Sequence, residues 1–275
     1  MRALPWFVSV LLLAGLARAA RHQRRAACAP PPMPACRLPA GKGGAVRRAA
    51  AMPGAAERAH GLLLGLLHDG GPCGNAHALA TGADARAQAN ALADDWHIHT
   101  AGEARGTLAW LLEEGHRALY PQVCRILFKV PRAAREREIV RLDQLFDPVR
   151  LALCVDHLER ALPGLRAARF IASGQDLARG VLAWDMSRAI HLARMAHDCG
   201  MQTDAQAWAV IERAAAQAFA HYASWEQVVA GYLLGRAMWA GPDAGFARHM
   251  AFARACIDDP AGPWRASPYP RRGPV

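Results

Sequence analysis

Residues 181–196 read VLAWDMSRAIHLARMA, and this stretch decides the fold. A helix advances by roughly 100° per residue, which places Trp184, Arg188 and His191 on one face. Leu192 and Met195 continue that face, and apolar or small side chains fill most of the remaining circumference. A helix that is apolar nearly all round is buried on several sides. The stretch therefore predicts a central helix in an all-α fold.

The helical periodicity continues on both sides of this stretch, with no run of alternating β-branched residues. Capping boxes, in which Glu or Gln follows a Ser or Thr by three residues, predict helix starts at Thr100, Thr203 and Ser224. Pro148 stands where a first-turn proline is expected. The predicted helices span 57–68, 82–97, 100–119, 132–146, 148–161, 175–198, 203–221, 224–239 and 243–257. The sequence thus predicts a single irregular helical bundle of about eight to ten helices.

The chain before this bundle has a different character. Residues 4–17 (LPWFVSVLLLAGLA) are uncharged and are followed by four arginines between positions 18 and 25. Their length suits the apolar part of a signal peptide, whereas the arginines favour an anchor that holds the following chain on the cytoplasmic side. The third alternative is a start codon chosen too far upstream. We expect a membrane-associated or exported protein, or a cytoplasmic one if the start site is mis-chosen.

Composition suggests four parts along the chain. We predict a signal peptide or membrane anchor over 1–20 and a helical domain over 57–258. Residues 21–56 are rich in Pro, Ala and Arg with few large apolar side chains, which predicts a disordered linker. Residues 259–275 are expected to form a Pro-rich C-terminal tail.

The net charge of +10 is concentrated at the N-terminus. Residues 1–58 contain ten Lys and Arg but a single acidic residue, whereas 59–275 contain 23 basic and 22 acidic residues. A nucleic-acid-binding domain usually carries a clear excess of positive charge. We therefore expect no nucleic-acid partner for the helical domain.

Two predicted helices carry charges where apolar residues are expected. Arg236 lies in the middle of an aromatic stripe on 224–239, and Asp185 and Arg188 lie together on 175–198. His116 approaches an apolar face one turn beyond Leu112. A buried guanidinium requires a carboxylate or several carbonyls as partners, so we expect these side chains to form one polar cluster. The aromatic residues expected around it are Trp184, Trp225, Tyr232 and Trp239.

Five blocks of sequence carry a resemblance to a known family. They are DWHIH (95–99), WLLEEGHR (110–117), WDMSR (184–188), DAQAW (204–208) and SWEQVVAGYLLGRAMW (224–239). In this order, they resemble the YbeU/YbeR-like family of bacterial proteins, catalogued as domain of unknown function 1266, over roughly 60–257. The resemblance implies an α-helical architecture and no established catalytic mechanism.

Familiar catalytic and cofactor motifs are missing from the sequence. It contains no nucleophile elbow, P-loop or dinucleotide fingerprint, and its seven cysteines form no C-x-x-C pair. His97 and His99 are two residues apart and point to different faces of a helix, so we expect neither a metal site nor a cofactor. No catalytic residue is assigned.

Two functions follow from these observations. Our first hypothesis is a non-enzymatic module that binds another protein, for example as a toxin-immunity or accessory protein. The alternative is an enzyme or ligand-binding protein that holds an anionic small molecule with Asp185, Arg188, Arg236 and His116. A purely structural network of ion pairs would need no ligand at all.

Overall fold

The computed structural model describes residues 55–69, 78–260 and 262–270, and this part of the chain is α-helical without a β-strand. The all-α prediction is confirmed. The expected N-terminal segment and most of the expected linker lie outside the described residues. No helix within the described residues is long and apolar enough to cross a membrane. The helices are α2 (Ala55–Asp69), α3 (Ala85–Trp96), α4 (Ala101–Glu113), α5 (Tyr120–Lys129), α6 (Arg135–Val140), α7 (Pro148–Ala167), α8 (Gly174–Ala178), α9 (Leu182–Asp198), α10 (Asp204–His221), α11 (Trp225–Ala240), α12 (Ala244–Asp258) and α13 (Pro263–Ala266).

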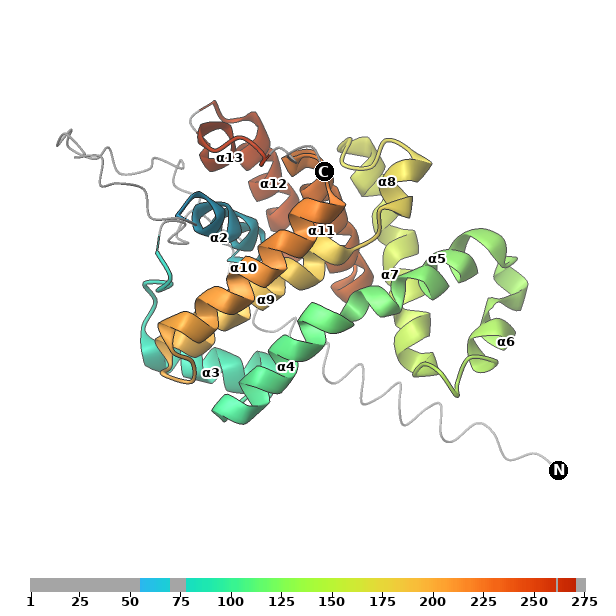
Figure 1. Ribbon diagram of the computed structural model, residues 1–275. Coiled ribbons are helices and arrows are strands. Elements are labelled where there is room, and N and C mark those ends of the chain that lie inside the picture. Colours follow the sequence, from blue (N-terminus) through green and yellow to red (C-terminus); the bar gives the residue numbers. More distant parts are fainter. Residues whose placement is uncertain (1–54, 70–77, 261, 271–275) are drawn as a thin grey trace. The chain divides into compact units, whose positions relative to one another are not determined.

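Helix α9 is the centre of the bundle, as its periodicity predicts. It packs against α2, α3, α4, α10 and α11, and it runs beside α10 with α4 next to them (Figure 1). Every residue from 183 to 196 is buried except His191, which is partly exposed. Burial of a large aliphatic side chain contributes about 1.5–3 kcal/mol, so this helix supplies a large share of the core's stability.

The predicted capping boxes mark real helix starts. Thr100 and Glu103 exchange hydrogen bonds at the start of α4, and Thr203 and Gln206 do so at the start of α10. Ser224 accepts the backbone N–H of Gln227 at the start of α11. These local signals fix three helix starts before any tertiary contact is considered.

Two predicted helices are interrupted by glycines. The helix expected over 100–119 ends at Glu113, because Gly115 adopts φ +59°, and a short 3₁₀ turn follows over His116–Ala118. The helix expected over 175–198 is divided into α8 and α9 at Gly180, where φ is +75°. A positive φ cannot continue a right-handed helix.

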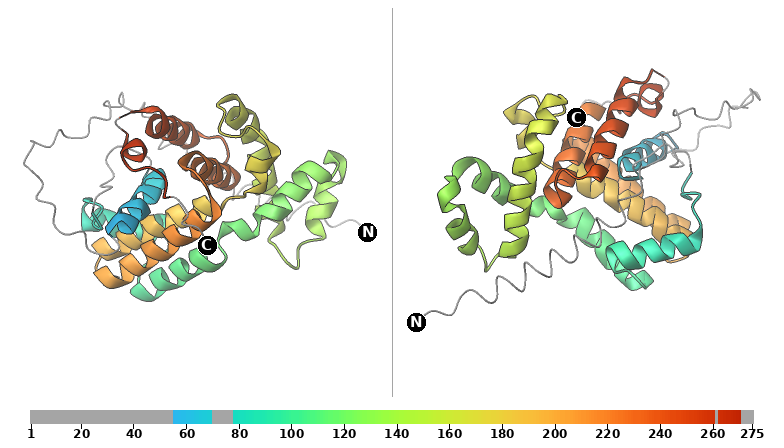
Figure 2. Two further views of the ribbon diagram at one scale, coloured as in Figure 1. Left: turned by 45° about the horizontal axis from the view of Figure 1, so that its top comes forward. Right: turned by 180° about the vertical axis from the view of Figure 1, so that it is seen from behind.

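The segment from 120 to 167 also differs from expectation. The sequence predicts no helix where α5 lies, although Pro121 occupies its first turn. The helix expected over 132–146 is reduced to a 3₁₀ turn over Arg132–Ala134 and to α6. Helix α7 continues past Pro163 to residue 167 instead of ending near 161. Helices α5 and α6 pack on α7 and on each other, and α7 packs on α11 (Figure 2).

The described part of the expected C-terminal tail packs on the core. Trp264 of α13 is 3% exposed, and its ring stacks on that of Trp225 at 5.3 Å between centroids. The indole N–H of Trp225 donates to the carbonyl of Ser267 at 3.1 Å, and the hydroxyl of Tyr269 donates to the carbonyl of Tyr222. Contrary to expectation, Trp225 therefore holds the C-terminal segment in place and does not surround the polar cluster.

Candidate functional site

Two glycines of α11 determine how closely its neighbours approach. A Cβ atom on Gly235 would lie 2.3 Å from Cβ of Trp184, and one on Gly231 would lie 2.3 Å from the hydroxyl oxygen of Tyr222. Non-bonded atoms do not approach so closely in a packed interior, so both contacts require glycine. The Gly-Tyr-x-x-Gly-Arg pattern thereby brings Trp184 against the α11 backbone, together with the polar residues that follow on α9.

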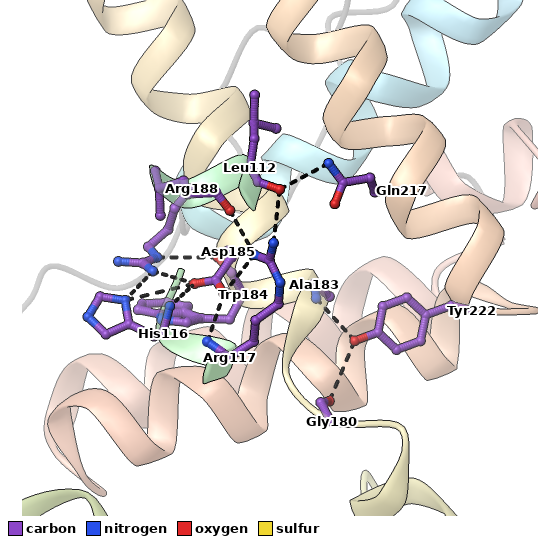
Figure 3. Close-up of polar contacts among 11 residues, drawn as sticks. Leu112, His116, Arg117, Gly180, Ala183, Trp184, Asp185, Arg188, Gln217 and Tyr222 are labelled. Atoms are coloured by element: carbon purple, nitrogen blue, oxygen red, sulfur yellow. Dashed lines mark hydrogen bonds and ion pairs between the residues drawn. The ribbon is translucent and has the colours of Figure 1, made fainter. Parts of the chain in front are cut away.

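Tyr222 fixes the start of α9. Its hydroxyl accepts the backbone N–H of Ala183 at 3.0 Å and donates to the carbonyl of Gly180 at 3.5 Å (Figure 3). The hydroxyl thus satisfies one of the amides that a helix leaves without an internal partner at its start. This contact positions the first turn of α9, which carries Asp185.

The carboxylate of Asp185 is the centre of a buried network. It accepts the backbone N–H groups of His116 and Arg117, each at 3.0 Å, and the guanidinium of Arg188 at 2.6 Å (Figure 3). Arg117 Nη1 adds a contact at 3.3 Å, and the Asp185 side chain is 0% exposed. A Cβ atom on Gly115 would lie 2.2 Å from Oδ2, so the turn closes on the carboxylate only because residue 115 is glycine.

Arg117 links this network to the end of α4. Its guanidinium donates to the carbonyls of Leu111 and Leu112 at 2.7 and 2.9 Å, and Gln217 of α10 donates to the same Leu112 carbonyl. A cation at the negative end of a helix dipole is favourable, and these bonds satisfy carbonyls that have no partner within the helix. Sequence reasoning missed Arg117, although it directly follows His116.

His116 packs against two indole rings and lies beside Arg188. The centroid of its ring is 4.0 Å from that of Trp239 and 4.9 Å from that of Trp110, and its Nδ1 is in contact with Arg188 Nη2. Because arginine can only donate, Nδ1 is the acceptor and the proton of the neutral ring is on Nε2. Burial, and then the charges of Arg188 and Arg150, lower the pKa of His116 to about 2.

Arg150 of α7 packs on the ring of Trp239, which in turn contacts His116. The central carbon of its guanidinium lies 3.1 Å from the centroid of the Trp239 ring, a cation–π contact. Burial lowers the pKa of Arg150, and its Nη2 atom is buried without a hydrogen-bond partner. Arg150 forms no ion pair within the described residues. No local sequence signal distinguishes it from the many surface arginines.

Arg236 pairs with Asp243 and not with Asp185, although the sequence predicts Arg236 and Asp185 in one polar cluster. Its Nη2 donates to both carboxylate oxygens of Asp243, at 3.1 and 3.3 Å, and Asp243 also caps the start of α12. The side chain of Arg236 is 13% exposed, and its Nη1 is buried without a partner. The partner is visible in the sequence as an aspartate directly after Pro242, a typical helix start.

Three histidines complete the cluster on the side of Arg236. The ring centroid of His68 of α2 is 4.8 Å from that of His191 and 5.5 Å from that of Trp184. Burial, followed by the charges of His191, Arg188, His249 and Arg236, holds the pKa of His68 well below its ordinary value. Tyr232 and Trp184 lie among these groups, with their rings 5.3 Å apart. We call Arg150, Arg188, Arg236, His68, His116, His191 and His249 the arginine–histidine cluster.

The unsatisfied atoms of the cluster and of the adjacent Trp184 are all hydrogen-bond donors. Within the described residues, five buried side-chain polar atoms have no partner, and three of them are Arg150 Nη2, Trp184 Nε1 and Arg236 Nη1. These donors come from α7, α9 and α11. An unsatisfied buried donor costs about 1–3 kcal/mol, and more when the group is charged. The missing partner of such a set is an acceptor, and with two arginines present an anion is the best match.

Comparison with known proteins adds a family but no function. No curated protein and no solved structure matches the chain. The sequence model of one family matches residues 91–269, which include every helix from α4 to α13. That match covers the whole cluster except His68, and it extends beyond the end of the expected domain at 258. The chain therefore belongs to the family described as Protein of unknown function (DUF1266).

Proposed function

We propose that the helical domain binds a small anionic molecule at the arginine–histidine cluster. The observation that carries this proposal is the set of three buried donors without acceptors, on Arg150, Trp184 and Arg236. Natural proteins rarely bury unpaired donors, and a bound ion is one of the partners that can satisfy them. An oxyanion such as a phosphate or carboxylate offers several acceptor atoms and negative charge at once.

Charge balance supports Arg150 as the first contact of the anion. Arg188 is paired with Asp185 and Arg236 with Asp243. Among the described residues no carboxylate lies within ion-pair distance of Arg150, and Asp147 acts on it only at longer range. Burial and then the charges of Arg188 and Arg150 lower the pKa of His116. Burial also lowers the pKa of Arg188, where Asp185 acts in the opposite direction and Arg150 adds a smaller lowering. A ligand anion beside Arg150 would relieve this repulsion and supply the missing acceptor.

The remaining polar residues act as positioning groups. Asp185 orients Arg188, and Arg188 in turn fixes the ring of His116 with its Nε2 proton. A ring whose pKa is about 2 accepts no proton at neutral pH, so His116 is unsuited to general-base catalysis in this arrangement. The contacts of His116 thus favour a positioning role for this ring. Our first hypothesis, a module that binds another protein, stays a prediction.

Thermal unfolding with added oxyanions tests the proposal. Phosphate, sulfate and small dicarboxylates would be added to the full-length protein, with Arg150→Met, Arg236→Met and the control Arg213→Met, a surface arginine paired with Glu113. At ten times its Kd, a ligand stabilises the folded state by about 1.4 kcal/mol. For a domain of this size, that raises Tm by about 3–6 °C.

We expect this increase in the native protein and in Arg213→Met, and a much smaller one in the two cluster variants. Isothermal titration calorimetry would then give Kd directly for any oxyanion that raises Tm. An equal increase in Tm for all four proteins would show that the anion acts elsewhere. No increase with any of the oxyanions would refute the proposed function. Because two independent arginines are tested, a folding failure of one variant leaves the other as the test.

A further inference from the structure

The exposed large apolar side chains are concentrated in one part of the domain. We call residues 120–153, which contain α5, α6 and the start of α7, the α5–α7 lobe. Among the described residues, five of the six exposed large apolar side chains lie in this lobe. They are Phe128 (44% exposed), Val140 (57%), Leu145 (74%), Val149 (51%) and Leu153 (44%). The sixth is Trp239 of α11 (36% exposed), which is in cation–π contact with Arg150 of the lobe. Single exposed apolar residues are ordinary, whereas five of them within one lobe suggest an interaction surface.

These side chains are not a poorly packed part of the core. On α7, Leu151, Val155 and Leu158 point inward and are buried. Val149 and Leu153 are four residues apart on the opposite, exposed face of the same helix. The helix therefore has two apolar faces, of which only one is covered by the rest of the domain.

The lobe also holds the excess positive charge of the folded part. It contains seven Lys and Arg and four Asp and Glu, whereas the rest of 59–275 contains 16 basic and 18 acidic residues. Lys129, Arg132 and Arg137 are exposed and form no ion pair within the described residues. Lys129 directly follows Phe128, and Arg137 is one turn from Val140. Apolar and cationic side chains are thus interspersed.

We propose that the α5–α7 lobe docks on the surface of an anionic phospholipid bilayer. Exposed Phe, Leu and Val side chains can enter the boundary between headgroups and acyl chains, while neighbouring Lys and Arg contact the lipid phosphates. The long aliphatic stems of Lys and Arg suit this position, because their charged ends remain in water. This inference goes beyond the proposed function and uses a different set of side chains.

The charge pattern favours lipid over two other occupants. A symmetric contact with a second copy would bring the cations of two lobes together, which is unfavourable. The centre of a protein interface is usually rich in aromatic residues, whereas four of the five exposed side chains here are aliphatic. The apolar run at 4–17, which we expect to associate with a membrane, would hold the domain near a bilayer.

Hydrogen–deuterium exchange of the full-length protein tests this proposal. The protein would be measured alone, with vesicles of phosphatidylcholine, and with vesicles that also contain phosphatidylserine. We expect peptides within 128–153 to exchange several-fold more slowly with the anionic vesicles only, while peptides from α10 keep their rates. Because the readout is local, binding through residues 4–17 alone cannot imitate it.

Two charge-matched variants sharpen the result. Leu145→Glu places a carboxylate on the most exposed apolar side chain, and Gln144→Glu places the same charge on its exposed neighbour. We expect the first to abolish the slower exchange of the lobe and the second to retain most of it. Equal exchange of the lobe with and without vesicles would overturn the proposal and leave a protein partner as the occupant. Equal loss in both variants would also overturn it, because charge alone would then explain the binding.

Discussion

His116 makes the stability of the domain depend on pH in a way that can be calculated. Its pKa is about 2 in the folded protein and about 6.5 when the chain is unfolded and the ring is in water. Between these values the unfolded state binds one more proton than the folded state. Stability contributed by the neutral ring is therefore present above the unfolded pKa and is lost as the pH falls below it.

The expected loss follows from linkage. Between pH 7 and pH 5, this one ring lowers the free energy of unfolding by about 2 kcal/mol. The same loss of unfolding free energy follows for any folded-state pKa of His116 below about 4. Other histidines with lowered pKa, such as His68 and His249, add to the total in the native protein.

The assay is urea unfolding of the native protein and of His116→Gln at several pH values from 5 to 7. Glutamine can still accept a hydrogen bond from Arg188 but has no proton to gain in this range. Only the difference in pH dependence is compared, because the substitution also changes packing between Trp110 and Trp239. We expect the variant to lose about 2 kcal/mol less than the native protein over this range. Parallel pH profiles for the two proteins would refute a buried neutral His116.

Three further predictions concern single residues. Asp185→Asn should lower the free energy of unfolding by about 3–5 kcal/mol, measured by urea unfolding, because Arg188 and Arg117 lose a buried carboxylate; a loss below about 1 kcal/mol would contradict the network. Gly235→Ala should reduce Tm in a calorimetric scan, because its Cβ would overlap Trp184, and Gly164→Ala on an open helix surface is the control. Arg150→Met should raise the unfolding free energy of the ligand-free protein by about 1 kcal/mol in the same urea assay. The substitution removes an unsatisfied buried donor, whose cost exceeds the stability that a partly exposed cation–π contact with Trp239 contributes. A lower unfolding free energy in this variant would argue that Arg150 has a structural role.

The sequence predicts the elements that depend on local chemistry. The buried face of α9 follows from its helical periodicity, and three helix starts follow from capping residues such as Thr100 and Thr203. The missed breaks lie at Gly115 and Gly180, where tertiary contacts select the positive φ. At Gly115 the positive φ is selected by Asp185, which lies 70 residues later in the sequence, because the turn must close on its carboxylate.

The cluster is predictable where its members share a helix or a neighbouring turn. Asp185 and Arg188 are one turn apart on α9, and His116 is brought to them by backbone bonds. Arg236 shares the aromatic stripe of α11 but pairs with Asp243, the residue that caps the start of α12. Arg150 contributes only through the packing of α7 on α11, which periodicity cannot reveal.

Hydrogen-bond satisfaction separates two roles within the cluster. The carboxylate of Asp185 has four donors and joins α9 to the turn after α4, so it is accounted for by stability alone. Arg150 and Arg236 each retain a buried donor without an acceptor, which lowers the stability of the ligand-free protein. A residue with a purely structural role gains nothing from an unsatisfied buried donor. A residue that binds a ligand uses that donor for a hydrogen bond once the ligand is present. The opposite effects expected from Asp185→Asn and Arg150→Met on unfolding therefore distinguish an internal salt bridge from a binding site before any ligand is identified.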